Sequence, residues 1–282
     1  MTVVLALIAG AVAAVVLLRT TAAVLAHPSL VRENYRGHSL PTAVGALLAA
    51  AVIAVDGGRT LLGVIGVGAA DTAPARLGVL AAVVMFAFLG LLDDLLGDAL
   101  DRGLRGHVAA ALRGRVTTGF VKLGGGAAVA LVLAATFDGD RPLRVLVDGA
   151  LIALAANMGN LLDRAPGRTI KWGIVAYLPL AVVAGTAAAG VALAVVVGAA
   201  AVLLVGDLRE RFMLGDTGAN ALGAALGMGA VLTVGPGERT ATAGVLLALT
   251  LLSELVSFSR VIEAVPPLRA FDRLGRLTET AP

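Results

Sequence analysis

Three clusters of acidic and amide side chains stand out in this otherwise apolar chain of 282 residues. The first is Asp93-Asp94, at the end of the apolar run 75–92. The second is NMGNLLD, residues 157–163, and the third is Asp216 in the glycine-flanked turn MLGDTG. Carboxylate and amide oxygens at a membrane edge suit the binding of a divalent cation, a phosphate or a sugar.

The second cluster places its polar side chains on one stripe of a helix. Asn157, Asn160 and Asp163 recur every three residues, and each step of three turns by about 60°, so the stripe is about 120° wide. Such a stripe can bind phosphate oxygens, sugar hydroxyls or Mg²⁺, or it can join two helices by hydrogen bonds. Basic residues that would neutralise a diphosphate follow directly and favour the first interpretation. They are Arg164, Arg168 and Lys171.

Each of the other two clusters also has two interpretations. Asp93-Asp94 is either a pair of carboxylates beside an anionic substrate or a solvated helix end, where negative charge opposes the helix dipole. Asp216 is either a ligand or the N-cap of a helix that begins near Gly218. Gly215 and Gly218 favour the ligand, because glycine lets a phosphate or metal approach the backbone closely.

The composition predicts an integral membrane protein. Hydrophobic residues make up 59% of the chain, charged residues 15%, and the mean hydropathy is +0.94. The apolar runs are continuous rather than alternating, which predicts helices and not barrel strands. We therefore expect an all-α, polytopic transmembrane helix bundle of about nine to ten helices in a single domain, residues 1–282. The expected spans are 2–25, 42–56, 75–92, 119–137, 143–162, 170–186, 188–206, 218–235 and 240–259. The run 60–70 is too short to span and is expected to extend the second helix or form a re-entrant piece.

The distribution of basic residues predicts the orientation. With the N-terminus outside, most of the 22 Lys and Arg residues fall on the cytoplasmic side, as the positive-inside rule requires. The exceptions are Arg59, Arg76, Arg141, Arg144 and Arg239. All three polar clusters then lie at the cytoplasmic face.

The polar segments favour a membrane partner over nucleic acid. The net charge of +3 fits cytoplasmic loops that contact anionic headgroups. The longest polar segment, 95–122, lacks the interleaved aromatic residues of a nucleic-acid platform. The tail, 259–282, alternates apolar and basic residues and is expected to form a cytoplasmic amphipathic element.

The ordered motifs resemble those of a known enzyme superfamily. An apolar run ending in DD, then NxxNxxD, then a GDxG turn is similar to the polyprenyl-phosphate N-acetylhexosamine-1-phosphate transferases. The matching pieces cover nearly the whole chain in the family's order. They are NYRGHSLPTAVG (34–45), FLGLLDDLLG (88–97), NMGNLLD (157–163) and FMLGDTGANALG (212–223), with a weaker match in SELVSFSRVI (253–262).

The resemblance implies an enzyme that moves a sugar-1-phosphate from a UDP-sugar, of the N-acetylhexosamine type, onto a polyprenyl phosphate and releases UMP. It implies Mg²⁺, with Mn²⁺ as the alternative ion, a multi-pass protein of the cell membrane with a cytoplasmic active site, and a role in cell-envelope polysaccharide or peptidoglycan synthesis. A homodimer is compatible with it, and a nucleic-acid partner is not expected.

The resemblance also assigns roles to residues of this chain. Asp216 and Asp94 would bind the metal. Asp93, Asp94, Asp163 and Lys122 would be catalytic, with Asp93 or Asp94 deprotonating or positioning the lipid phosphate. From the resemblance and from the residue types together, we predict a wider set of substrate contacts: Asn157, Asn160, Arg164, Arg168, Lys171, Asn220, Arg36, Arg269 and Arg273.

The last cytoplasmic segment departs from the family. The family carries a His-rich motif there, whereas this chain has no His after His107. Our hypothesis is that Arg269, Arg273 and Arg276 replace it as phosphate contacts. An alternative function is a catalytically inactive relative that acts as a membrane scaffold or as a lipid-handling or transport protein. A transporter would place polar groups near the bilayer midplane, whereas these cluster at one face.

Overall fold

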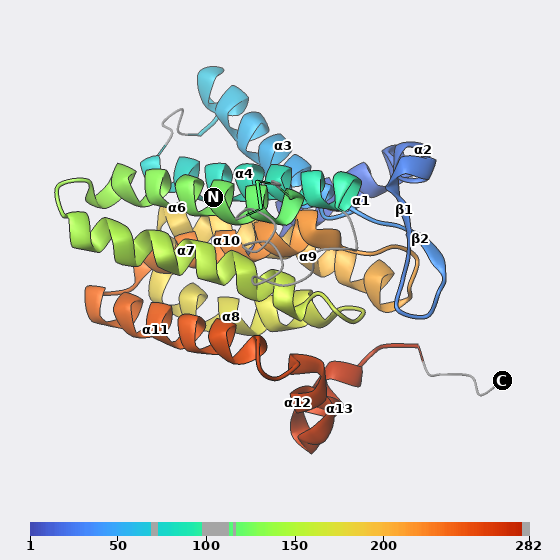
Figure 1. The fold of residues 1–282 in the computed structure, drawn as a ribbon. Coiled ribbons are helices and arrows are strands. Elements are labelled where there is room, and N and C mark those ends of the chain that lie inside the picture. Colours follow the sequence, from blue (N-terminus) through green and yellow to red (C-terminus); the bar gives the residue numbers. More distant parts are fainter. Residues whose placement is uncertain (69–72, 98–112, 115–116, 278–282) are drawn as a thin grey trace.

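The protein is a bundle of long helices. The computed structural model describes residues 1–68, 73–97, 113–114 and 117–277, and the helices of this part run mostly along one common direction (Figure 1). The long helices have 17 to 23 residues each. They are α1 (Val3–Thr20), α3 (Ala46–Val64), α4 (Pro74–Leu96), α6 (Thr118–Asp138), α7 (Pro142–Leu162), α8 (Arg168–Ala184), α9 (Ala188–Leu208), α10 (Gly215–Thr233) and α11 (Pro236–Ser253).

The predicted all-helical bundle is confirmed, and several of its helices are long and apolar enough to span a membrane. Each expected apolar run coincides with one of these helices, and α3 continues through Val64, as the extension interpretation of 60–70 predicts. Within the described ranges, six helices are long and apolar enough to cross a membrane. The pair α11 and α12 (Phe258–Ala264), bent by 95°, makes a seventh if it is one broken span. Nine to ten spans and an external N-terminus stay predictions.

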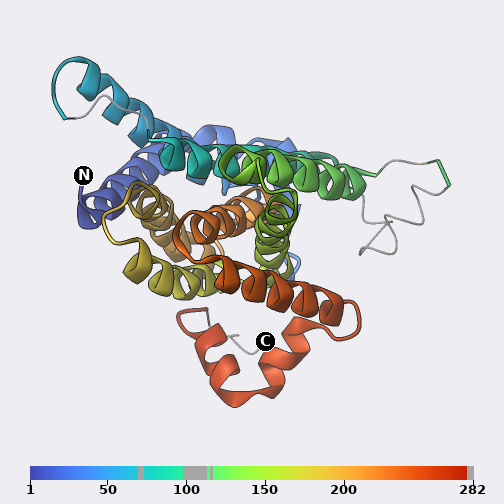
Figure 2. The same ribbon diagram turned by 90° about the vertical axis from the view of Figure 1, so that its left-hand side faces the viewer.

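Helix α10 is the buried centre of the bundle. It is rich in glycine and alanine, and most of its side chains are buried. It lies between α4 and α7, and the view along the bundle shows other helices around α9 and α10 (Figure 2). Gly90 of α4 and Gly159 of α7 allow this, because a Cβ at either position would collide with the α10 backbone at Asp216 or Ala219. Small residues let helices approach closely, as in membrane helix packing.

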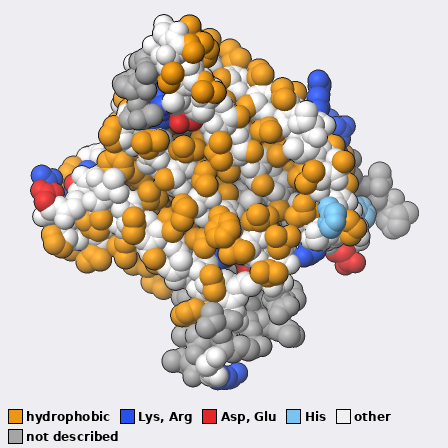
Figure 3. Space-filling view, turned by 90° about the horizontal axis from the view of Figure 1, so that it is seen from above, with side chains coloured by type: hydrophobic (Ala, Val, Ile, Leu, Met, Phe, Trp, Pro, Cys, Tyr) orange, Lys and Arg blue, Asp and Glu red, His pale blue; other side chains and the backbone are white. Residues whose placement is uncertain are grey.

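The outside of the bundle is apolar. Large side chains such as Val4, Ile8 and Val12 on α1 and Leu61 on α3 are about half exposed or more. Figure 3 shows hydrophobic side chains over most of one face, with charged and His side chains mostly near its edges. An apolar surface of this extent suits lipid rather than water.

The connection after α1 folds against the turn that precedes α10. It contains a two-stranded ribbon that the sequence did not predict, in which Asn34 Oδ1 accepts hydrogen bonds of 2.9 Å from the backbone N–H groups of Arg36 and His38. Met213 N donates to Pro41 O at 2.8 Å. The elements are α2 (Ala22–Leu25), a 3₁₀ turn (Pro28–Leu30), β1 (Val31–Glu33) and β2 (Ser39–Pro41).

The C-terminal segment lies across one end of the bundle. After the bend, α12 and α13 (Pro266–Arg273) form a short helical pair below α11 (Figures 1 and 2). Helix α13 has apolar and charged residues on different faces, as expected for the amphipathic tail 259–282. Residues 278–282 of that tail, and 98–112 and 115–116 of the polar segment 95–122, lie outside the described residues.

The close contact between α4 and α10 predicts that a methyl group added at Gly90 destabilises the protein, whereas one added at an open helix position does not. Gly90→Ala forces the two backbones apart, so we expect a loss of about 1–3 kcal/mol in stability, seen as a lower thermal unfolding midpoint of the detergent-purified protein. Gly124→Ala on α6 is the matched control, because its Cβ meets nothing within 4 Å. If the two variants unfold at the same temperature, this account of the helix contact is wrong.

Candidate functional site

Four helix ends bring the polar residues of all three clusters together. Asp93 and Asp94 end α4, Lys122 lies in the first turns of α6, Asn160 is near the end of α7, and Asp216 is in the first turn of α10. The contacts among them, described below, make one site at one end of the bundle. The prediction that the three clusters meet on one face is therefore confirmed for these residues.

Asp94 caps helix α10 from a different helix. Its Oδ1 accepts a hydrogen bond from Asp216 N at 3.0 Å, and its Oδ2 accepts from Thr217 N at 3.0 Å and from Thr217 Oγ1 at 2.6 Å. The first N–H groups of a helix have no partner within it, and Leu214, at the N-cap position, supplies no side-chain hydrogen bond. Gly215 makes the turn possible with a φ of 74°. Asp216 is thus not the N-cap of α10, and its carboxylate is left for other contacts.

Lys122 lies between two carboxylates from two other helices. Its Nζ donates to Asp93 Oδ2 at 2.7 Å and also forms an ion pair with Asp216. The three side chains are 17–26% exposed, so they are partly shielded from water but accessible. Sequence analysis predicted Asp216 and Asp94 as metal ligands, and the geometry pairs Asp216 with Asp93 instead, because the oxygens of Asp94 are engaged by α10.

The polar stripe of α7 divides between two roles. With its amide nitrogen turned toward Asp216, Asn160 lies 2.6 Å from Oδ1 and 3.2 Å from Oδ2 of that carboxylate. Asn157, one turn earlier, donates to Thr250 Oγ1 of α11 at 3.3 Å. Asn160 therefore lies in the carboxylate site, and Asn157 joins two helices, as the second interpretation of the stripe predicts. Binding of phosphate, sugar or Mg²⁺ by the stripe stays a prediction.

Asp163 follows α7 and completes the acidic end of the site. Burial raises the pKa of its carboxyl well above the ordinary value, and the negative charges of Asp207, Asp216 and Asp94 raise it further. Thr169 Oγ1 lies 3.3 Å from Asp163 Oδ1. A carboxyl whose pKa is raised toward the working pH suits general acid or base chemistry.

Two of the predicted phosphate contacts bind the C-terminal segment instead. Arg168 donates from Nε and Nη2 to the two oxygens of Asp272, both at 2.8 Å, and Lys171 donates to the carbonyl oxygens of Phe271 at 3.0 Å and Leu274 at 3.1 Å. Both basic side chains are buried. The structure does not bring them to the carboxylates of the site.

The remaining predicted substrate contacts are dispersed. Arg36, in the connection after α1, forms an ion pair of 3.3 Å with Glu210, in the connection between α9 and α10. Arg269 and Arg273 pair with Glu263 on the exposed face of α13. Arg164 is exposed after α7, and Asn220 is buried on α10 with no hydrogen-bond partner for Nδ2 among the described residues. Arg276 bonds to Asp272 and to the carbonyl of Pro166.

The site residues fit a Mg²⁺ ion of the substrate-bridged type. No group of three or more His, Asp or Glu side chains in the described ranges is arranged to hold a metal alone. Mg²⁺ commonly takes one or two carboxylates and completes its shell with water and substrate phosphate. Asp93 and Asp216 already converge on one cationic group, Lys122, so their oxygens are suitably directed for such an ion.

Four residues that shape the site or its surroundings were not predicted from the sequence. Thr217 and Thr169 contact Asp94 and Asp163, as described above. Asp207 of α9 accepts a hydrogen bond from Gly167 N at 2.8 Å and so holds the turn after α7. Its position at the end of an apolar run is the same signal that identified Asp93-Asp94. Asp272 carries no comparable signal, because acidic residues are ordinary in a polar tail.

Comparison with known proteins adds no family assignment. No protein-family model matches the chain, and no curated protein sequence matches it.

Arg168, Lys171 and Arg276 together form a clamp that holds the segment around Asp272 against the start of α8. This clamp predicts that the attachment of the C-terminal segment depends on pH. Burial raises the pKa of Asp272, but the hydrogen bond from Arg168 and the charges of Arg168, Arg276 and Lys171 outweigh it, so the net pKa is lowered. A lowered folded pKa stabilises the attachment above the unfolded pKa of about 3.9, and this stabilisation is lost as the pH falls through the folded pKa.

We expect Asp272→Asn to weaken the attachment by about 3 kcal/mol, because it breaks a buried charge pair. Hydrogen exchange of residues 264–277 should become roughly 100-fold faster at neutral pH. The wild type should lose protection only below about pH 4, while the variant lacks this step. Glu263→Gln, which removes an exposed pair, is the control and should change little. Unchanged protection in Asp272→Asn would contradict the clamp.

Proposed function

We propose that this protein is a phosphoglycosyltransferase that moves a sugar-1-phosphate from a UDP-sugar onto a polyprenyl phosphate and releases UMP. The observation that carries the proposal is the convergence of Asp93 and Asp216 on Lys122 at the end of a bundle with an apolar outer surface. An enzyme of this kind needs a charged site at the membrane edge, because one substrate is a lipid and the other is soluble.

The charges of the site suit two polyanionic substrates when a divalent cation is present. Asp93 and Asp216 would hold Mg²⁺, or Mn²⁺ in its place, together with diphosphate oxygens. The ion would offset the charge of the diphosphate and of the departing UMP. Lys122, freed in part from its carboxylates, would contact a phosphate oxygen. Asn160 would keep the Asp216 carboxylate in position.

The proposed reaction is an exchange of phosphoanhydride bonds. An oxygen of the polyprenyl phosphate attacks the β-phosphorus of the UDP-sugar and forms a new P–O bond. The bond from that phosphorus to the bridging oxygen breaks, and UMP leaves with its electron pair. Asp163, whose pKa is raised by burial and by neighbouring carboxylates, would exchange a proton with bound phosphate. Catalysis would rest on positioning and charge stabilisation, as in other phosphoryl transfers.

The orientation follows from the basic residues. In the sequence, the connections next to the site residues are rich in Lys and Arg, and the positive-inside rule assigns such connections to the cytoplasm, where UDP-sugars are made. The proposal therefore places the protein in the cell membrane with the site facing inward, in a step of cell-envelope polysaccharide or peptidoglycan synthesis.

The test is release of UMP by the purified protein with undecaprenyl phosphate, Mg²⁺ and a panel of UDP-sugars. We expect Asp216→Asn to lower turnover at least about 100-fold. It removes a carboxylate that would bind the divalent ion, and this ion would stabilise the charge on the diphosphate during the transfer. Asp140→Asn is the matched control, since this side chain is 81% exposed in the turn between α6 and α7. It should keep wild-type activity, and chelation of the divalent ion should abolish activity.

Two outcomes would overturn the proposal. The first is no UMP release by folded wild-type protein with any UDP-sugar, which would favour an inactive relative that serves as a scaffold or handles lipid. The second is equal turnover by the Asp216→Asn and Asp140→Asn variants, which would remove the carboxylate site from the reaction.

A further inference from the structure

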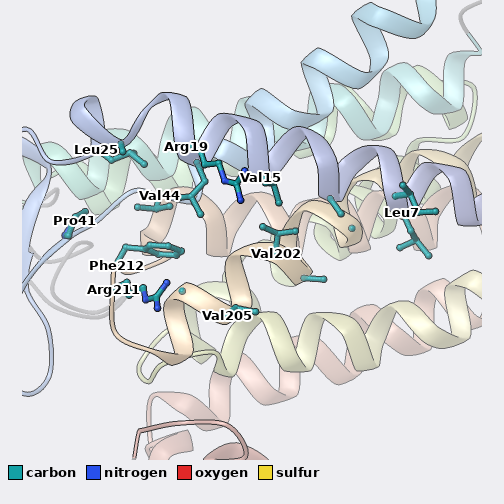
Figure 4. Close-up of a pocket in the computed structure, with 17 residues that line it drawn as sticks. Leu7, Val15, Arg19, Leu25, Pro41, Val44, Val202, Val205, Arg211 and Phe212 are labelled. Atoms are coloured by element: carbon teal, nitrogen blue, oxygen red, sulfur yellow. The ribbon is translucent and has the colours of Figure 1, made fainter.

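A long apolar groove lies between α1 and α9 and reaches the connections that precede α3 and α10. It has a volume of about 950 Å³ and is lined almost entirely by aliphatic side chains, including Leu7, Val15 and Val202. Figure 4 shows Leu7 at one end and Phe212 and Pro41 toward the other. The carboxylate site is built on α4, α6, α7 and α10, and none of its carboxylates lines the groove.

The groove arises from how α1 and α9 meet. The two helices touch at Gly10 and Gly198, where a Cβ would collide with the backbone of Val195 or Leu7. From this contact toward the end of α1, small side chains such as Ala11 and Ala201 line the gap and leave it open. The backbones touch at these glycines, and the groove runs beside this contact along both helices.

Two cationic side chains line the half of the groove that lies nearer Pro41. Arg19 comes from the last turn of α1 and Arg211 from the connection between α9 and α10 (Figure 4). Both are exposed, and neither side chain makes a hydrogen bond or ion pair with another described residue. The groove lining contains no Asp or Glu. An apolar channel that carries two cations without a partner among the described residues complements an amphiphile with an anionic head.

The distance along the groove from Leu7 to Arg19 matches one leaflet of a bilayer, and the lining continues past Arg19 to Leu25 and Pro41. From Leu7 to Arg19 the helix rises by about 18 Å at 1.5 Å per residue, and half of a hydrocarbon core is about 15 Å. A phospholipid acyl chain fits this depth, whereas a long polyprenyl chain would exceed it. A zwitterionic head would bring its own cation beside the two arginines, so an anionic head is favoured.

We propose that this groove binds one anionic phospholipid, with an acyl chain between α1 and α9 and the phosphate head held by Arg19 and Arg211. The proposal does not depend on the proposed enzymatic function.

The test measures retained lipid directly. The full chain is reconstituted with equal amounts of phosphatidylglycerol and phosphatidylcholine, and the lipids that stay bound are counted by native mass spectrometry. We expect one phosphatidylglycerol to be retained in preference to phosphatidylcholine. The double variant Arg19→Gln/Arg211→Gln should bind it about 30-fold more weakly, at about 1 kcal/mol for each arginine. Arg209→Gln, an exposed arginine that does not line the groove, should bind as the wild type does.

A second pair of variants tests the groove itself. Ala11→Trp fills the channel and should abolish retention, while Val12→Trp, on the neighbouring 56% exposed position of α1, should not. The arginine variants change only exposed side chains, so they stay informative if Ala11→Trp does not fold. Equal retention of the two phospholipids, or wild-type binding by the double variant, would overturn the proposal. Displacement of phosphatidylglycerol by equimolar undecaprenyl phosphate would also overturn it, because the groove would then belong to the lipid acceptor.

Discussion

The hydrogen bonds from the start of α10 to Asp94 are the interaction on which the site depends. Two backbone N–H groups and one hydroxyl group of α10 donate hydrogen bonds to this single carboxylate of α4. Without it, those donors would lose their partners in a partly buried position, at a cost of about 1–3 kcal/mol each. The same bonds fix the rotation of α10 about its axis, and so they decide where the side chain of Asp216 points.

The charge balance of the site explains why it is suited to a bound cation. Asp93, Asp94, Asp163 and Asp216 lie near each other, and Lys122 is the basic side chain that contacts two of them directly. Carboxylates at this spacing repel one another strongly where water is partly excluded. One ammonium group offsets part of that repulsion, and the helix N-terminus beside Asp94 offsets more. The excess of negative charge that is left favours a positively charged ligand.

Much of the fold and part of the site could be predicted from the sequence. Continuous apolar runs locate the helices, because a helix needs about 20 consecutive apolar residues to cross a bilayer. Carboxylates at the ends of such runs indicate which ends of the helices carry the site. The sequence could not separate Asn157 from Asn160, since both lie on the same stripe and only the neighbouring helices decide which one reaches Asp216. The sequence also could not predict the ion pair between Arg168 and Asp272, because Asp272 lies about a hundred residues away in a polar tail that has no distinguishing pattern.

The glycine-rich character of α10 has a consequence for how the chain is built into its membrane. This central helix is not among the six described helices that are apolar enough to cross a bilayer unaided, and its flanks are covered by α4 and α7. A segment of such modest hydropathy partitions poorly into lipid by itself and gains its stability from close helix contacts. During synthesis, α10 should therefore settle only after α4 and α7 are already in place, which makes the site one of the last parts of the chain to mature.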